Sequence, residues 1–167
     1  MARCCVRFEP TISEREALLD AYYYPHHDAL TRAVETALQT FGSCVIIDCH
    51  SFPSLAPSYE LDKSAQRPEI CVGTDEFHTP DWLVALCVRA FRDEGYSTAI
   101  NSPYVGRLVP SAHFRSDQPV SPIMIEMNRR VDMDEVSGER LAKFTTHRDA
   151  VHSALSAVRA TLSPKSH

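Results

Sequence analysis

The stretch from Glu69 to Asn101 reads as a strand, a helix and a second strand, and this pattern constrains the fold more than any other feature. "EICVG" is a short apolar strand, and "YSTAIN" is the second one. Between them, "TPDWLVALCVRAFRDEG" is an amphipathic helix with Thr79 as its cap, Pro80 as its first residue and Gly95 as its stop signal. A helix between two strands brings them together in parallel through a right-handed crossover. We therefore predict a parallel strand pair covered by a helix.

Further helices and strands are predicted on both sides of this unit. One helix begins at Ser13 and ends or kinks at Pro25, and a second covers residues 27–41 and stops at Gly42. "SCVIIDC" is a continuous apolar run, which is typical of a strand buried on both faces, and "PIMIEMN" is another buried strand. The closing helix covers residues 147–162.

Two long segments without periodicity, at residues 51–68 and 102–121, are predicted to be surface loops. Long loops in compact domains often carry function. The sum is an α/β fold, a three-layer sandwich of helices around a mixed, mostly parallel sheet. The length of 167 residues predicts a single domain over residues 1–167.

Composition and charge exclude several classes of function. The net charge is −5 and the basic residues are scattered, so a nucleic-acid partner is not expected. No apolar run reaches the ~18 to 20 residues of a membrane span, and the start has no signal-peptide pattern. Four of the six cysteines fall in apolar segments, which indicates a reduced, cytoplasmic protein.

Polar residues follow three of the predicted strands. Asp48 and His50 end one strand, Asn101 ends another, and Glu126 and Asn128 end a third. Ligands of open α/β sheets gather at the carboxyl ends of the strands, so these side chains are expected to converge.

His50 is a candidate metal ligand, because it follows a dry strand and enters a loop rich in proline and serine. The alternative is a core histidine bonded to a backbone carbonyl. Asp48 faces the same way two residues earlier, and a carboxylate there would hold the ring as carboxylates hold zinc-bound histidines. Asp48 is otherwise a cap or a salt-bridge partner.

Glu126 lies in the apolar run "PIMIEMN", where an ionised side chain is costly without a partner. Burial would raise its pKa toward the range of a general base. Pairing with Arg129 or Arg130 is the competing explanation. Arg129 would clamp a substrate carboxylate, or it lies on a solvated turn.

The familiar catalytic motifs are absent from the sequence. There is no HExxH motif, no CxxC pair and no GxSxG elbow, so His50 is one good ligand without an evident set. Cys49, expected in the core, and Cys71 have apolar surroundings that argue against a cysteine nucleophile.

Four segments, in this order and with these separations, resemble the N-formylglutamate amidohydrolase family. They are "IIDCHSFPS", "RPEICVGTDEFHTP", "NSPYVGRLVP" and "IMIEMNRR". The upstream "ISEREALLDAYYYPHHDAL" also resembles the helix that precedes the histidine strand in that family. The resemblance covers nearly the whole chain, which matches the C-terminal part of such an enzyme.

The resemblance implies a zinc-dependent amidohydrolase with a carboxypeptidase-like fold that removes the formyl group from N-formyl amino acids, an activity of histidine catabolism. In that picture His50 is a metal ligand, with Asp48 behind it, and Glu126 is the general base. Arg129, Asn101 and Tyr104 match pocket motifs of the family and are expected to bind the substrate, an N-acyl amino acid.

The family's N-terminal part carries a PHSG-like motif and an acidic residue that resemble the first two metal ligands. Residues 1–11 hold no counterpart, so the zinc ligand set is incomplete in this chain. One explanation is that the chain is a fragment, or the product of a misplaced start codon, of a normal enzyme. A second is a reduced homologue that recruits His27, His78 or His113. Another is a truncated, non-catalytic homologue that binds a small molecule or a partner chain. Exposed sheet edge and apolar surface would favour oligomers, including homo-oligomers.

Overall fold

The fold was analysed in a computed structural model, which describes residues 9–60, 62–63, 66–116 and 119–162. The chain divides into two compact units, one made of residues 1–44 and 110–119 and the other of residues 45–109 and 120–167. Each unit is described by itself. The single domain expected from the length stays a prediction.

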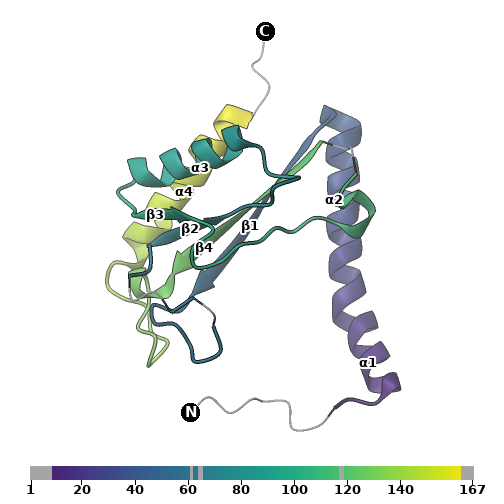
Figure 1. The fold of residues 1–167 in the computed structure, drawn as a ribbon, viewed down its shortest axis with the longest axis horizontal. Coiled ribbons are helices and arrows are strands. Elements are labelled where there is room, and N and C mark those ends of the chain that lie inside the picture. Colours follow the sequence, from purple (N-terminus) through teal and green to yellow (C-terminus); the bar gives the residue numbers. More distant parts are fainter. Residues whose placement is uncertain (1–8, 61, 64–65, 117–118, 163–167) are drawn as a thin grey trace. The chain divides into compact units, whose positions relative to one another are not determined.

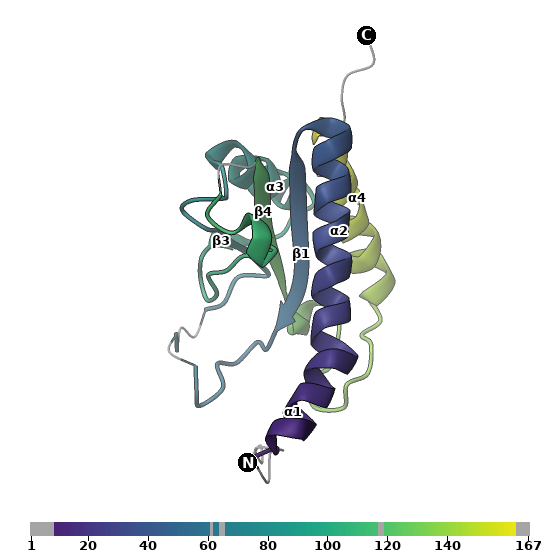
Figure 2. The same cartoon turned by 90° about the vertical axis from the view of Figure 1, so that its right-hand side faces the viewer.

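The first unit is dominated by a long helical column, which Figure 2 shows from α1 to α2. It consists of α1 (Ile12–Leu18), the π-helical turn η1 (Leu19–Tyr23) and α2 (Tyr24–Phe41), and a short 3-10 turn, η2 (Ser111–His113), belongs to the same unit. The cap of α1 is Thr11, which forms a capping box with Glu14, and the helix begins at Ile12, so the expected start at Ser13 was one residue late. Gly42 ends α2 in the left-handed conformation, as predicted, with φ of 73°.

Pro25 does not end the column. In η1 the backbone N–H of Tyr24 donates to the carbonyl of Leu19, five residues back, and α2 then resumes with Pro25 in its first turn. A proline is tolerated there because its missing N–H has no required partner in the first turn of a helix. The helix end or kink predicted at Pro25 is therefore a change from a π-helical turn to an α-helix.

The second unit contains a four-stranded sheet in the order β1-β4-β2-β3 (Figure 1). The strands are β1 (Cys44–Phe52), β2 (Ile70–Gly73), β3 (Thr98–Ile100) and β4 (Val120–Asn128). β2 and β3 pair in parallel, as the strand-helix-strand pattern predicted, and β1 and β4 run in the same direction. β2 and β4 are antiparallel, so the α/β prediction of a mixed, mostly parallel sheet is confirmed.

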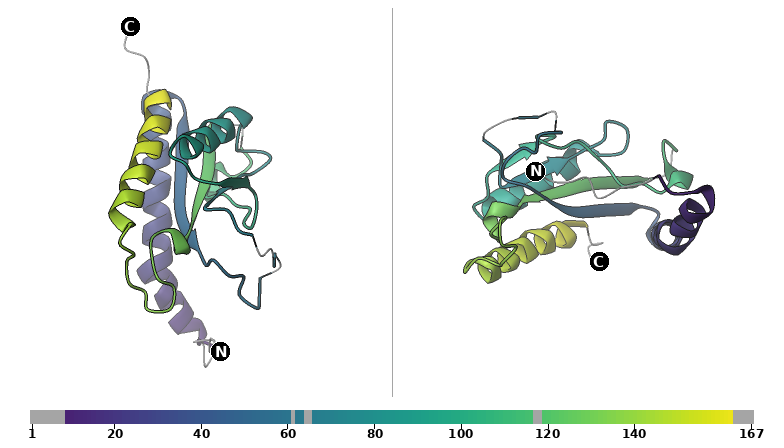
Figure 3. Two further views of the ribbon diagram at one scale, coloured as in Figure 1. Left: turned by 90° about the vertical axis from the view of Figure 1, so that its left-hand side faces the viewer. Right: turned by 90° about the horizontal axis from the view of Figure 1, so that it is seen from below.

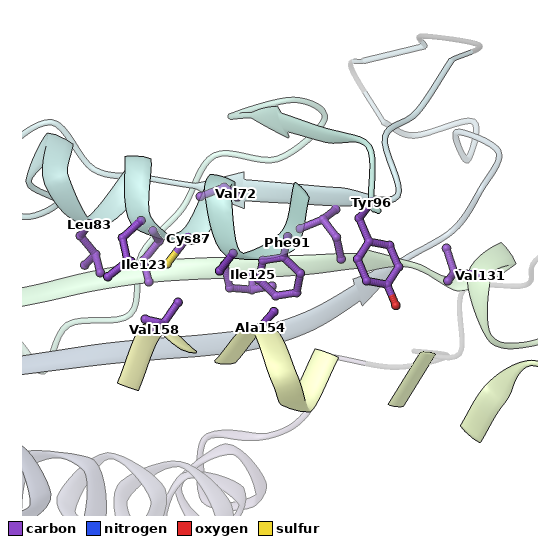
Figure 4. Close-up of a cluster of buried hydrophobic side chains, with 13 residues drawn as sticks. Val72, Leu83, Cys87, Phe91, Tyr96, Ile123, Ile125, Val131, Ala154 and Val158 are labelled. Atoms are coloured by element: carbon purple, nitrogen blue, oxygen red, sulfur yellow. The ribbon is translucent and has the colours of Figure 1, made fainter. Parts of the chain in front are cut away.

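Two helices, α3 (Asp81–Asp93) and α4 (Phe144–Leu162), pack against each other and bury one side of the sheet. Figure 4 shows their side chains meeting Ile123 and Ile125 of β4, with Phe91 and Val158 fully buried. Figure 3 shows α4, in yellow, running alongside the strands. Alternate residues of β2 and β4 join this core, as period-two strands with one covered face require.

The N-terminus of α3 differs from the expectation in its cap. Pro80 occupies the cap position, and the Thr79 side chain makes no cap hydrogen bond to the helix. Its hydroxyl instead accepts from the N–H of Asp75 at 2.9 Å and donates to the carbonyl of Pro122 at 2.8 Å. Thr79 therefore joins the turn after β2 to the start of β4.

β1 corrects the prediction of a strand buried on both faces. It lies at the edge of the sheet, where Ile46 and Phe52 are buried but Val45 and Ile47 only partly so, and Cys49, expected in the core, is exposed. An apolar run cannot by itself distinguish a central strand from an edge strand, because both pack side chains on the same core.

In the part of the chain that the structure describes, no helix is both long enough and apolar enough to cross a membrane.

Candidate active site

Three of the candidate residues lie on the side of the sheet that faces away from α3 and α4. Val45 and Ile47 of β1 pack toward the helices, so Asp48 and His50, which alternate with them, point to the other face. On β4 the core-facing residues are Ile123 and Ile125, and Glu126 points to the same face as His50. We call this face, which α3 and α4 do not cover, the open face. Strand periodicity thus groups the three polar side chains without any special loop geometry.

His50 and Asp48 are in direct contact. The Nε2 atom of His50 lies 2.8 Å from Oδ2 of Asp48, and the two side chains are 48% and 21% exposed. The hydrogen bond that His50 donates to Asp48 raises the pKa of His50 above its ordinary value, while partial burial opposes the rise. The imidazole is accessible to solvent and is held by a carboxylate, as the alternation along the strand predicted.

Glu126 is the buried member of the group, with 9% of its surface exposed. Burial raises the pKa of its carboxyl group, and the negative charge of Asp48 adds to the rise, whereas His50 and Arg129 oppose it. Its Oε2 atom is buried without a hydrogen-bond partner among the described residues. A desolvated carboxylate with an unpaired oxygen is a stronger base than one in water, which suits proton abstraction.

Arg129 begins the short 3-10 turn η3 (Arg129–Val131), directly after β4. Its Nε and Nη2 atoms donate to Oγ and to the carbonyl oxygen of Ser51, both at 3.2 Å. The guanidinium therefore joins the ends of β4 and β1. Its positive charge also acts on Glu126, which places it at the edge of the same group.

Asn101 lies away from this group, so the expected convergence of all strand ends was wrong. Its side chain is paired with Thr74 at the end of β2, accepting from the backbone N–H and donating to Oγ1, both at 2.8 Å. β4 runs antiparallel to β2, so its carboxyl end meets the start of β2 instead. Asn128 accordingly bonds to Pro68 and Glu69.

Tyr104 contributes to a second polar cluster that the sequence patterns did not indicate. Its hydroxyl donates to Glu60, and Glu60 forms an ion pair with Arg67, whose side chain is 1% exposed. Arg67 also donates to the carbonyls of Pro53 and Asp62, both at 3.1 Å. Burial acts against the charges, but the hydrogen bonds from Arg67 and Tyr104 hold the pKa of Glu60 below its ordinary value.

This Tyr104–Glu60–Arg67 cluster organises the loop that follows β1. The only signal in the sequence was that Glu60 and Arg67 have opposite charges within the proline-rich loop. Such a pair usually lies in solvent. The cluster is buried against Phe52. The Phe52 ring packs edge to face with Tyr104, at 5.6 Å between ring centroids, and the guanidinium of Arg67 lies over the same ring. These contacts join segments that are distant in the chain, so spacing alone could not reveal them.

The zinc expectation can be tested against the donor set. Among the described residues, no group of three or more His, Cys, Asp or Glu side chains is placed to hold a metal ion. His50 offers one imidazole, whose Nε2 atom contacts Asp48, while a catalytic zinc takes three protein ligands. The residues present therefore do not form a zinc site by themselves.

The histidines considered as substitute ligands lie elsewhere. His27 stacks on Tyr23 within the first unit, and His113 lies in η2 of that unit. His78 is buried in the turn after β2, where its backbone N–H donates to Asp75. Recruitment of any of them stays a prediction.

The described cysteines are poor nucleophiles. Burial raises the pKa of Cys71, which donates to the carbonyl of Tyr104, and raises that of Cys87 to about 12. Partial burial also raises the pKa of Cys44, and desolvation by the surrounding chain together with the negative charge of Asp48 raises the pKa of Cys49. A thiolate mechanism needs the opposite shift.

Comparison with known proteins identifies relatives of this chain. The family model of N-formylglutamate amidohydrolase matches residues 3–133. An N-formylglutamate deformylase of Pseudomonas aeruginosa is 26% identical over 131 residues, which are 75% of this chain and 47% of the relative.

Solved structures agree with the sequence relatives. The crystal structure of an N-formylglutamate amidohydrolase from Ralstonia eutropha matches with a TM-score of 0.77 and 31% identity, over 90% of this chain and 56% of that one. A gene product of Agrobacterium tumefaciens shares the fold, with a TM-score of 0.60 and 18% identity over 93% and 58% of the two chains. The chain spans about half the length of these relatives. The family model nevertheless covers well over half of this chain, which therefore belongs to the N-formylglutamate amidohydrolase family.

Proposed function

We propose that this chain carries part of the active site of an amidohydrolase that removes the formyl group from N-formyl amino acids such as N-formylglutamate. The observation that carries the proposal is the buried carboxyl of Glu126, with an unpaired oxygen and a raised pKa, on the same open face as the Asp48–His50 pair. Family membership supports the reaction class, and two relatives, an N-formylglutamate deformylase and an N-formylglutamate amidohydrolase, support the substrate class.

Glu126 is the proposed general base. Its carboxylate would take a proton from a water molecule whose oxygen attacks the formyl carbon, and the carbonyl oxygen would gain the negative charge of a tetrahedral intermediate. Cleavage of the carbon–nitrogen bond then releases formate, and the proton held by Glu126 passes to the leaving amine. The steps attributed to Glu126 are assigned to Oε2, its buried oxygen without a hydrogen-bond partner among the described residues.

The other roles follow from charge and placement. Arg129 is the proposed partner for a substrate carboxylate, because its guanidinium lies at the edge of the group. Its Nε and Nη2 atoms are bonded to Ser51, which holds the guanidinium in place. Asn101 and Tyr104 remain proposed substrate contacts, although both side chains are already paired, with Thr74 and Glu60. His50 is the proposed metal ligand, with Asp48 orienting it.

Zinc is proposed as the metal on the strength of the resemblance. No step above depends on it, because the described residues supply one histidine and no complete ligand set. We further propose that the protein acts in the cytoplasm, in histidine catabolism, without nucleic-acid or membrane partners, and that it assembles as a homo-oligomer.

A second candidate function is binding without catalysis, either of a small molecule or of a partner chain. The observations that favour it are the incomplete donor set and the edge strand β1, whose apolar residues Val45 and Ile47 are only partly buried. An apolar strand edge of this kind is a template for pairing with another chain.

The two candidates are separated by an assay for formate released from N-formylglutamate by the full chain, with and without added zinc. We expect formate release that Glu126→Gln lowers by about 100-fold or more, which is the size of the loss of a general base. Glu139→Gln is the matched control, because Glu139 is an exposed carboxylate outside the site. Equal rates for wild type and Glu126→Gln would remove Glu126 as the base, and no release from any form would favour the binding function.

A further inference from the structure

The four residues that follow His50 are each held by residues distant in the chain. Arg129 donates twice to Ser51, at 3.2 Å in both contacts, and Arg67 donates to the carbonyl of Pro53 at 3.1 Å. Phe52, between them, is 1% exposed. The last contact in this series is at Ser54.

Ser54 is held by Glu135. Its backbone N–H donates to Oε1 at 2.8 Å and its hydroxyl donates to Oε2 at 2.6 Å, across 81 residues of sequence. Both carboxylate oxygens are therefore committed to one residue. Hydrogen bonds to an ionised acceptor are shorter and stronger than neutral ones, and two of them fix orientation as well as distance.

The turn that carries Glu135 is itself well defined. The carboxylate of Asp134 accepts from the backbone N–H groups of Val136 and Ser137, at 2.9 and 2.8 Å. These bonds hold the pKa of Asp134 below its ordinary value, so its charge persists to acidic pH. Glu135 thus projects from a turn with its own stabilising contacts toward the end of β1.

The contact matters because β1 is an edge strand. Its outer side lacks a neighbouring strand in the described sheet, and such strand ends open with little free energy. His50 lies only four residues before Ser54 and has a half-exposed side chain, so its position depends on what holds the chain after it. The contact between His50 and Asp48 depends on the same strand geometry.

We propose that Glu135 is a positioning residue for His50, acting through Ser54. The proposal rests on the proposed function only in that His50 belongs to the active site. Glu135 holds the end of β1 so that the imidazole stays next to Asp48 and on the face of Glu126. Its role is to keep the histidine in place, and the chemistry of hydrolysis belongs to other side chains.

The test is NMR of the full chain at one fixed pH, comparing wild type with Glu135→Ala. The ring nitrogen signals of His50 are identified from their loss in His50→Ala. We expect Glu135→Ala to shift or broaden the His50 signals and to speed hydrogen exchange of the Ser54 amide about tenfold, the size of a charged hydrogen bond. Ring signals of His147, which bonds to the hydroxyl of Tyr96 at 3.0 Å, should not move and report an intact core.

Three further variants sharpen the result. Glu139→Ala, on the same turn, should change neither readout. Ser54→Ala removes one of the two hydrogen bonds to Glu135 and should shift the His50 signals in the same direction by a smaller amount. If Glu135→Ala does not fold, Ser54→Ala provides the test in its place. Glu135→Gln keeps one acceptor and should restore part of the wild-type signal.

Faster exchange at Ser54 with unmoved His50 signals would overturn the proposal, because the contact would then serve the loop alone. Unchanged exchange at Ser54 would overturn it as well. Neither readout requires hydrolysis, so a failure to release formate would count against the proposed function without affecting this test.

Discussion

The strands β4 and β1 both deliver a titratable side chain to the open face of the sheet, but the protein holds them in different ways. β4 lies between two strands and most of its residues are buried, so Glu126 is fixed by its strand and is largely removed from water. β1 lies at the edge, so His50 remains half exposed and its strand end is tied by side chains from other segments. The central strand therefore carries a desolvated carboxyl group, whereas the edge strand carries an accessible imidazole whose strand end is held by other segments.

The largest test of this difference is the same truncation made in each strand. Ile123→Ala, at a fully buried position of β4, should lower the free energy of unfolding by about 4 kcal/mol through lost burial and a cavity. Ile47→Ala, in β1, should cost about 1 to 2 kcal/mol, because Ile47 is only partly buried. Urea unfolding measures both. Equal losses would show that β1 is as well packed as β4, and the contrast between the strands would fail.

Glu126→Gln tests the cost of the buried carboxylate. Burial raises the pKa of Glu126 in the folded protein, so folding favours the protonated form and stability falls as pH rises from the unfolded value of about 4.3 through the folded value. The neutral amide removes this cost, and we expect a gain of about 1 kcal/mol at neutral pH.

The gain should disappear at pH values below about 4, where the wild-type carboxyl is protonated in both states. Urea unfolding at several pH values measures it, and Glu139→Gln is the control, since Glu139 is an exposed carboxylate. A gain independent of pH would mean that desolvation of the charge is not its cause.

Asp48→Asn gives the smallest expected effect, because the contact is partly solvated. The hydrogen bond that His50 donates to Asp48 raises the pKa of His50. Its stabilising contribution is therefore present below the unfolded pKa of about 6.5 and is lost as pH rises through the folded pKa. Replacing Asp48 should therefore lower stability at pH 5.5 by less than about 1 kcal/mol, after allowing for solvent screening, and should have little effect at pH 9.

NMR titration of the His50 ring should show the change more clearly than unfolding does. Its pKa should fall toward the ordinary value in Asp48→Asn and stay unchanged in Asp20→Asn, a matched exposed aspartate on η1. A His50 pKa that does not respond to Asp48→Asn would remove the contact as a determinant of the imidazole's charge.

The helices and strands were largely predictable because each depends on local pattern. The parallel pair with its helix, the stop at Gly42 and the strand before Pro53 all follow from periodicity and from the conformational preferences of glycine and proline. Thr79 was assigned to the wrong partner, because a threonine before a helix is equally able to bond a neighbouring strand, and here it bonds Pro122.

The candidate site was predictable only in part. Asp48, His50 and Glu126 were identified from polar residues in apolar strands, and alternation placed the first two on one face. Asn101 was grouped with them incorrectly, since the direction of β4 relative to β2 cannot be read from either strand. Arg67 was missed because its burial depends on contacts across the chain.

By itself, the sequence determined the kinds of elements, the order of strands and helices along the chain, and which side chains alternate on each strand, because these depend on neighbours within a few residues. Only the tertiary structure decided which strand lies at the edge, which strand ends meet and which charges are buried. Those properties arise from pairing and packing between distant segments, where Glu135 meets Ser54 and Arg67 meets Pro53.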